Sequence, residues 1–97
     1  MAHFVVLVNF TDQGAKAIRD TPKRAEAYRT MAEKAGVKVH SFLWTLGCYD
    51  VVIVAEANDD AAIAALGLSA VSLGNVRSQT LRGFDIGEMK GIIGKMA

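Results

Sequence analysis

The sequence predicts an α+β fold in which an antiparallel four-stranded sheet carries its helices on one face. Three observations lead to this prediction. Segments of strand and helix character follow one another in the order βαββαβ, the 97 residues leave room for a single domain over 1–97, and two of the strands are apolar on both faces. This element order is that of ferredoxin-like folds, in which the first and third strands lie in the centre of the sheet.

The composition is that of a folded chain with a core. It is 52% hydrophobic and 22% charged, which is too apolar for a disordered chain. Eleven Lys and Arg against ten Asp and Glu, without a basic run, give no sign of nucleic-acid or anionic-membrane binding. We expect no membrane span and no secretory signal. The single cysteine, Cys48, fits a reducing compartment, so we expect a cytoplasmic protein.

The first predicted strand spans Phe4–Phe10. Its residues are mostly β-branched or aromatic, types that pack well on a pleated surface, and only Asn9 interrupts the apolar run. The segment Thr11–Gly14 contains turn-forming residues and ends the strand. The residues that follow, Ala15–Asp20, have room for a short helical turn.

The first long helix is predicted from about Pro22 to Ala35. Thr21 is the expected N-cap, proline is favoured at the first helical position, and Gly36 is the expected left-handed terminator. Small and apolar residues recur at helical spacing on one side, while charged residues occupy the rest. One stripe therefore faces the sheet: Ala25, Tyr28, Met31, Ala32 and Ala35.

The next two strands form a predicted antiparallel hairpin. Val37–Leu46 is the first of them, Gly47–Cys48 is the expected turn, and Tyr49–Ala57 is the second strand, apolar on both faces. Alternation sorts the first strand into two faces, with Lys38, His40, Phe42, Trp44 and Leu46 on one and Val39, Ser41, Leu43 and Thr45 on the other.

The last third of the chain holds a helix, a strand and a weaker helix. Asn58–Asp60 caps the first helix, which continues to about Ser72 and is expected to be mostly buried because Ala, Leu and Ile dominate it. Val76–Phe84 alternates polar and apolar residues as the fourth strand. A tail helix begins at Asp85, and its apolar side consists of Met89, Ile92, Ile93 and Met96.

Two helices cover only one face of such a sheet, so the opposite face needs another cover. Its aliphatic residues are Val5 and Leu7 in the first strand and either Val51 and Ile53 or Val52 and Val54 in the third. Burying one such side chain is worth about 1.5 to 3 kcal/mol, so four or more per subunit support a specific interface. We therefore expect a homodimer, or a higher homo-oligomer, in which two sheets face each other.

Four strings of the sequence share the pattern of one known family. They are residues 6–14 (VLVNFTDQG), 20–24 (DTPKR), 44–52 (WTLGCYDVV) and 74–82 (GNVRSQTLR). Together they resemble the GYD-domain family of small bacterial and archaeal proteins, over nearly the whole chain. The resemblance implies a ferredoxin-like domain related to the dimeric α/β-barrel proteins and leaves the biochemical role undefined. We expect a polar residue in many relatives at the position of Cys48, so a thiol-dependent scheme gains no support.

Five side chains near strand ends are considered as candidates for contact with a small ligand. Asn9 either enters a cavity beneath a partner sheet or bonds the backbone of the following turn. Trp44 and Tyr49 flank the hairpin turn and either sandwich a planar ligand or belong to the core. Arg77 and Arg82 have opposite strand parity, so at most one shares a cavity with Asn9, where it would hold a carboxylate or phosphate.

Asp50 and His40 are the candidates for proton transfer. Asp50, which is also a ligand-binding candidate, would act as a general base if burial favoured its neutral form; the alternative is an ion pair with Arg77 or Arg82 that fixes strand register. His40 is either an acid–base group or a solvated or partner-facing side chain.

The sequence predicts neither a metal site nor a cofactor. His3, His40 and Cys48 are the only softer ligands, and none has the spacing of His-x-x-x-His or Cys-x-x-Cys. Glycines stand singly at segment ends, as turn residues do, without a phosphate loop, and no nucleophile elbow is present.

These observations favour a homo-oligomeric module that binds a small organic molecule in a largely apolar pocket between paired sheets. Two alternatives remain open. One is an enzyme similar to the cofactor-independent oxygenases or isomerases on dimeric α/β barrels, and the other is a purely structural or interaction subunit.

Overall fold

The computed structural model describes residues 1–97 and has the predicted order of elements. The four strands are β1 (Ala2–Phe10), β2 (Lys38–Trp44), β3 (Val51–Ala57) and β4 (Val76–Gly83). The helices are α1 (Asp12–Lys16), the 3-10 turn η1 (Ile18–Asp20), α2 (Thr21–Lys34), α3 (Asp60–Val71) and α4 (Ile86–Gly94).

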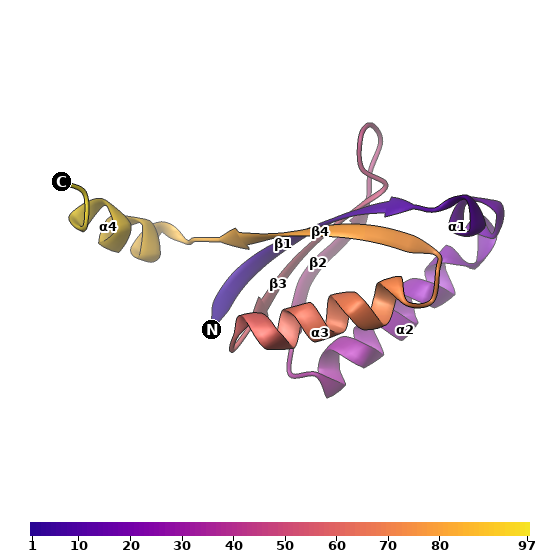
Figure 1. The fold of residues 1–97 in the computed structure, drawn as a ribbon, viewed down its shortest axis with the longest axis horizontal. Helices are drawn as coiled ribbons and strands as arrows, with labels where there is room; N and C mark the ends of the chain where they lie inside the picture. Colours follow the sequence, from indigo (N-terminus) through magenta and orange to yellow (C-terminus); the bar gives the residue numbers. More distant parts are fainter.

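The strands form one sheet in the order β2-β3-β1-β4, and every neighbouring pair is antiparallel. β1 and β3 are therefore central, as predicted. Helices α2 and α3 cover one face of the sheet, while α4 lies beyond the end of β4, away from the body (Figure 1). The predicted ferredoxin-like α+β fold is confirmed.

The strand register decides which residues share a face. Val5 pairs with Val54 and Leu7 pairs with Val52, so these four side chains lie on the face without helices. Of the two pairs that the sequence left open, Val52 and Val54 therefore lie on the helix-free face, because Val51 and Ile53 point to the helices.

The core lies entirely between the sheet and the helices. Only 13 of the 97 residues are buried, none of them polar or charged by side chain. The alternate residues of the two central strands supply most of it: Phe4, Val6 and Val8 from β1, and Val51, Ile53, Ala55 and Ala57 from β3. The chain by itself thus buries one face of its sheet and leaves the other uncovered.

The predicted hairpin is present, but two of its details were wrong. A bulge between Val39 and Ser41 interrupts the alternation in β2, so Val39 lies on the helix side with Phe42 instead of opposite to it. The connection is also longer than the expected Gly47–Cys48 turn, since no strand residue lies between Trp44 and Val51.

Two helical expectations also needed correction. The stretch after β1 does not simply break the chain, because Thr11 caps α1, its side chain accepting a hydrogen bond from Gly14 N at 3.2 Å. Helix α3 is less buried than its composition suggested, since only Ile63 and Leu66 are buried and Leu68 is 68% exposed. Gly36 has φ +74°, as expected for a helix terminator.

Helix α4 stands apart from the body of the protein (Figure 1). It has no buried residue, and its apolar side chains are at least partly exposed: Ile86, Met89, Ile92 and Ile93. An isolated helix of nine residues is marginal in water, so α4 depends on its attachment to the sheet and on further contacts. No helix of the protein has the length and apolar character that crossing a membrane requires.

Candidate functional site

The helix-free side of the sheet, here called the open face, presents an aliphatic surface that spans all four strands. The register places Leu43 of β2 beside Val52 and Leu81 of β4 beside Val5. Leu43 is 60% exposed and Leu81 is 42% exposed. The open face therefore comprises six aliphatic residues in contact with solvent or only partly covered: Val5, Leu7, Leu43, Val52, Val54 and Leu81.

One end of the open face carries two of the predicted ligand-binding residues. Asn9 and Arg77 are direct partners in the β1–β4 register, so they share this face, whereas Arg82 pairs with Phe4 on the helix side. With its amide nitrogen turned toward the neighbouring carbonyls, Asn9 donates to Cys48 O at 2.9 Å and to Val8 O at 3.3 Å. Asn9 thus ties the β2–β3 loop to β1.

Asp50 lies at the same end and has a backbone partner. Its carboxylate Oδ2 accepts a hydrogen bond from Phe10 N at 2.8 Å, and its own N–H donates to Val8 O at 2.8 Å. Asp50 forms no ion pair with Arg77 or Arg82, so the predicted ion pair that would fix the strand register was wrong. The residue holds the start of β3 against the end of β1 through the backbone.

Trp44 lies on the other side of the sheet from Asn9. Its indole Nε1 donates to Thr21 Oγ1 at 3.1 Å, and its ring packs against Phe42 with centroids 5.1 Å apart. Tyr49 belongs to the loop that precedes β3, where its carbonyl accepts a hydrogen bond from the Thr45 hydroxyl. The structure therefore brings Asn9, Asp50 and Arg77 together and separates Trp44 from them.

The opposite end of the open face holds a cluster of histidines and carboxylates. Glu56 lies between two imidazoles, 3.3 Å from His3 Nδ1 and 3.4 Å from His40 Nε2. His3 Nε2 also lies 3.4 Å from Asp85 Oδ2 and 3.8 Å from Glu88 Oε1. His40 is therefore far along the strands from Asp50, and the two proton-transfer candidates do not form one site.

Sequence spacing did not reveal this cluster, because its members come from the two ends of the chain. His3, Asp85 and Glu88 have potential ligand atoms within 4.8 Å of one another, so the cluster has the residue types of a metal site. The carboxylates already have protein partners, however. Asp85 and Glu88 form the capping box of α4, and Arg82 Nη2 pairs with Glu88 Oε2 at 3.0 Å.

The hydrogen bonds of this cluster lower the pKa values of two of its carboxyl groups. The pKa of Asp85 is lowered chiefly by the hydrogen bond from the backbone N–H of Glu88, with His3 adding to the effect. The pKa of Glu88 is lowered chiefly by the hydrogen bond from Arg82. Both groups therefore favour the charged form, and the cluster anchors α4 to the edge of the open face.

The four strings that carry the family resemblance meet at the Asn9 end of the sheet. Thr11 bonds Gly74 O through its hydroxyl at 2.6 Å, and Gln13 Nε2 bonds Asn75 Oδ1 at 3.0 Å. Arg24 donates to Gly14 O at 3.3 Å. With the Thr21–Trp44 bond, these contacts join all four strings, so the family pattern describes the junction of the sheet with α1, α2 and the β2–β3 loop.

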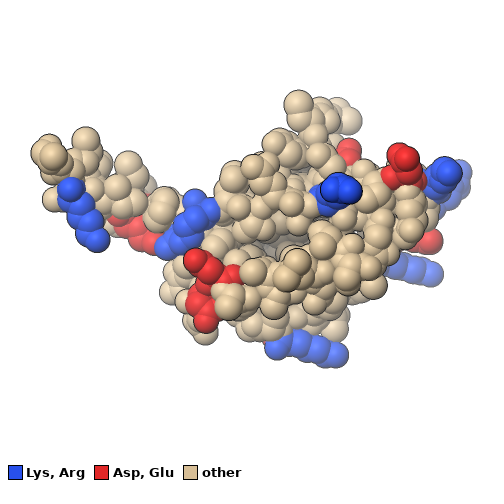
Figure 2. All heavy atoms as spheres, in the orientation of Figure 1, with Lys and Arg blue, Asp and Glu red and all other residues tan.

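Charged groups are sparse on the molecular face shown in Figure 2. Lys, Arg, Asp and Glu side chains of both signs lie mainly around its edge, and most of the face is uncharged. This distribution agrees with the balanced composition of 11 basic and 10 acidic residues and gives no single-sign surface.

The fold and the open face together define a class: a ferredoxin-like α+β domain with one helix-covered and one uncovered sheet face. Within that class the chain belongs to the GYD-domain family, whose model matches residues 4–93. It is 34% identical over 90 residues to the glutamine synthetase and cystathionine β-lyase binding protein of Thermus thermophilus, an alignment that covers 92% of this chain and 95% of the relative.

Two solved structures share the fold at low sequence identity. The C-terminal domain of the MgtC protein from Mycobacterium tuberculosis has a TM-score of 0.52 and 10% identity, covering 84% of this chain and 86% of that one. Methylated RPA0582 protein has a TM-score of 0.50 and 20% identity, covering 89% of this chain and 82% of that one. Both similarities concern the fold alone.

Proposed function

We propose that this protein is a homodimeric interaction module, in which two copies pair their open faces and the dimer binds other proteins. The observation that carries the proposal is the aliphatic surface in the middle of the sheet, formed by Val5, Leu7, Val52 and Val54 and extended by Leu43 and Leu81. Exposed apolar surface of this kind marks interaction sites in folded proteins.

A second copy suits the open face because an apolar surface can pack against the same surface of another copy in a two-fold contact. Strands about 4.8 Å apart, with about 3.3 Å per residue, give the four-stranded face a size of roughly 20 by 25 Å. This area is smaller than the surface that a standard interface buries, which is about 800 Å² per partner. Helix α4, attached at His3 beside the open face, adds further apolar side chains to the surface that a second copy meets.

The wider interaction role is supported by the relative from Thermus thermophilus, whose name says that it binds glutamine synthetase and cystathionine β-lyase. We extend enzyme binding to this chain on the strength of that similarity. The proposal includes the cytoplasmic location expected from the single cysteine.

The test of the dimer uses the same substitution at three exposed leucines. Leu43→Glu and Leu81→Glu each place a carboxylate on the open face, and Leu68→Glu places one on α3 as the matched control. Because all three leucines are exposed in the single chain, the variants are expected to fold, which circular dichroism verifies. Light scattering after gel filtration is expected to give a dimer for the parent and for Leu68→Glu, and monomers for the open-face variants, since an unpaired interfacial charge costs several kcal/mol. A dimer that persists in both open-face variants contradicts the proposal.

The enzyme-binding part is tested with immobilised glutamine synthetase and cystathionine β-lyase from the same organism as this chain. Saturable binding of the parent protein to either enzyme, measured by biolayer interferometry, supports it. Absence of binding to both enzymes overturns the extension from the relative, while the dimer stands or falls on the leucine variants.

A small-molecule site between the paired sheets is the second candidate function. It is favoured by the register partners Asn9 and Arg77, which place an amide and a guanidinium at the end of an apolar surface. An arginine of this kind binds carboxylates or phosphates. At the same end, the Asp50 carboxylate accepts a hydrogen bond from the Phe10 backbone, and this contact favours a structural role for Asp50 over proton transfer.

A further inference from the structure

The helix-covered side of the sheet contains a cleft that the proposed interaction role does not use. It lies between the sheet and helices α2 and α3, and the space inside it is about 120 Å³. Fourteen of its 20 lining residues are hydrophobic. Figure 2 shows a hollow on this side of the molecule. Apolar walls with a few convergent polar groups are typical of small-ligand sites.

The cleft exists because the helices present small side chains to it. Ala25 of α2 and Gly67 and Ala70 of α3 line the space, and none of them is long enough to reach across to the valines of the sheet. A Cβ atom added at Gly67 would meet nothing within 4 Å, so the room there is real and unfilled. Tightly packed interiors leave few voids of this size.

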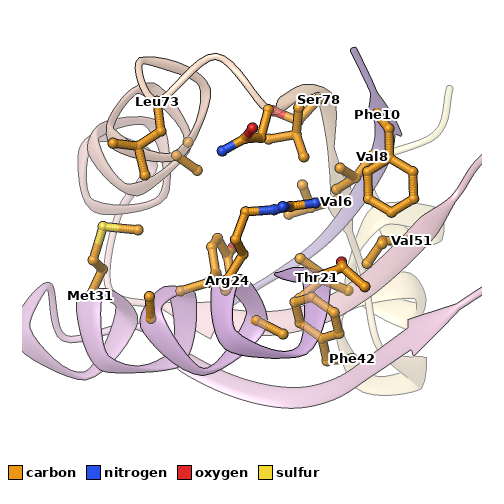
Figure 3. Close-up of a pocket in the computed structure, with 18 of the residues that line it drawn as sticks. Val6, Val8, Phe10, Thr21, Arg24, Met31, Phe42, Val51, Leu73 and Ser78 are labelled. Carbon is orange, nitrogen blue, oxygen red and sulfur yellow. The ribbon is translucent and has the colours of Figure 1, made fainter. Parts of the chain in front are cut away.

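One cation enters this apolar space. The guanidinium of Arg24 extends from α2 into the cleft (Figure 3). It donates to Ala17 O at 2.9 Å and to Gly14 O at 3.3 Å, which uses two of its five N–H donors. None of the ion pairs of the protein involves Arg24, so its charge has no carboxylate partner within the chain.

A second donor lines the same cleft. Tyr28 forms no side-chain hydrogen bond with the rest of the chain, and burial raises its pKa to about 12, so the phenol keeps its proton. The Thr21 hydroxyl, which accepts the hydrogen bond from Trp44 Nε1, also lines the cleft and couples it to the single tryptophan.

We infer that the cleft binds a small amphipathic carboxylate, with the carboxylate paired to the free donors of Arg24 and the apolar body against the valines of β1 and the alanines of α2 and α3. An unpaired guanidinium at an apolar wall is complementary to such a molecule, because it supplies the charge-assisted hydrogen bonds that a carboxylate loses on leaving water. The cleft lies on the opposite side of the sheet from the open face, so this site is independent of the proposed dimer.

The test is a titration of the full-length protein with sodium decanoate below its critical micelle concentration. Binding is measured by calorimetry and by the change in Trp44 fluorescence. Decyltrimethylammonium, with the same tail and the opposite charge, is the ligand control. Arg24→Gln removes the charge, Gly67→Leu fills the cleft, and Arg29→Gln is the matched control, since Arg29 is exposed on α2 and does not line the cleft. Circular dichroism verifies folding, and Ala70→Leu replaces Gly67→Leu if that variant is unfolded.

The inference predicts saturable binding of decanoate to the parent protein and binding about ten- to a hundredfold weaker to Arg24→Gln, as for a lost hydrogen bond to a charged group. Gly67→Leu is expected to abolish binding, and Arg29→Gln to change it by no more than about twofold, as surface substitutions do. The Leu43→Glu monomer is expected to bind as the parent does. No binding to the parent, equal binding to all variants, or a crystal structure with α4 of another copy in the cleft overturns the inference.

Discussion

The two faces of the sheet are built from alternate residues of the same strands, yet they have opposite surroundings. On β3, Ile53 is 2% exposed beneath the helices, whereas its neighbour Val54 lies on the open face and is only partly covered by the chain. Both are β-branched aliphatic residues. A central strand with apolar residues on both sides therefore has two packing surfaces: one is used within the chain, and the other is the one that we propose meets a partner.

The largest expected effect separates these two neighbours. Ile53→Ala leaves a cavity in the core and is expected to lower the free energy of unfolding by about 3 kcal/mol. Val54→Ala is expected to cost much less at high dilution, where the chains are separate, and more at high concentration. Chemical denaturation at two protein concentrations measures both. Equal, concentration-independent losses would show that the two faces do not differ in this way.

A second comparison concerns two glycines of the helix-covered side. A Cβ atom at Gly14 would lie 2.0 Å from Asn75 O, a backbone atom, so Gly14→Ala is expected to destabilise the protein by about 2 kcal/mol through overpacking. Gly67→Ala meets open space within a helix and is expected to stabilise it by about 0.5 to 1 kcal/mol. Thermal unfolding of both variants checks the opposite signs, and a neutral Gly14→Ala would mean that α1 and β4 are less closely joined.

A smaller effect is expected at the Asn9 end of the open face. Asp50→Ala removes the acceptor of the Phe10 N–H and is expected to lower stability by about 1 to 2 kcal/mol. Asp50→Asn keeps an acceptor oxygen and is expected to retain most of that stability. Denaturant titration of the two variants distinguishes them, and a loss that is the same for both would indicate that the charge matters more than the backbone contact.

The smallest effect is expected at the other end, in the attachment of α4. Because the pKa values of Asp85 and Glu88 are lowered in the folded protein, their contribution is complete above the ordinary carboxyl range and is lost as the pH falls below about 4. Hydrogen exchange of the α4 amides is expected to accelerate there. Glu88→Gln should weaken this pH dependence, and unchanged exchange in the parent between pH 6 and pH 3, after correction for the intrinsic rate, would contradict the anchoring role.

The fold was predictable because its signals are local and periodic. Alternation in the strands, Gly36 at the end of α2 and the two-sided apolar character of β1 and β3 each reflect a near-neighbour rule. The bulge in β2 was not predictable, since one extra residue shifts the face of His40 without changing the composition of the strand. The cap at Thr11 was missed because turn-forming and helix-capping residues are the same types.

The candidate sites were predictable only in part. Strand parity correctly put Asn9 and Arg77 on one face and Arg82 on the other. The cluster of His3 with Asp85 and Glu88 joins residues some 80 positions apart, and no spacing rule reports such a contact. The cleft at Arg24 depends on how far the helices stand from the sheet, which follows from the summed sizes of many side chains.

The most direct measurement of the central claim is an isotope-filtered nuclear Overhauser experiment on a mixture of labelled and unlabelled chains. It reports only contacts between different copies. If open faces pair, the methyl groups of Leu7 and Val54 will show cross-peaks to the other copy, while those of Leu68 on α3 will show none. Cross-peaks confined to Leu68, or a complete absence of contacts between copies at millimolar concentration, would contradict the account.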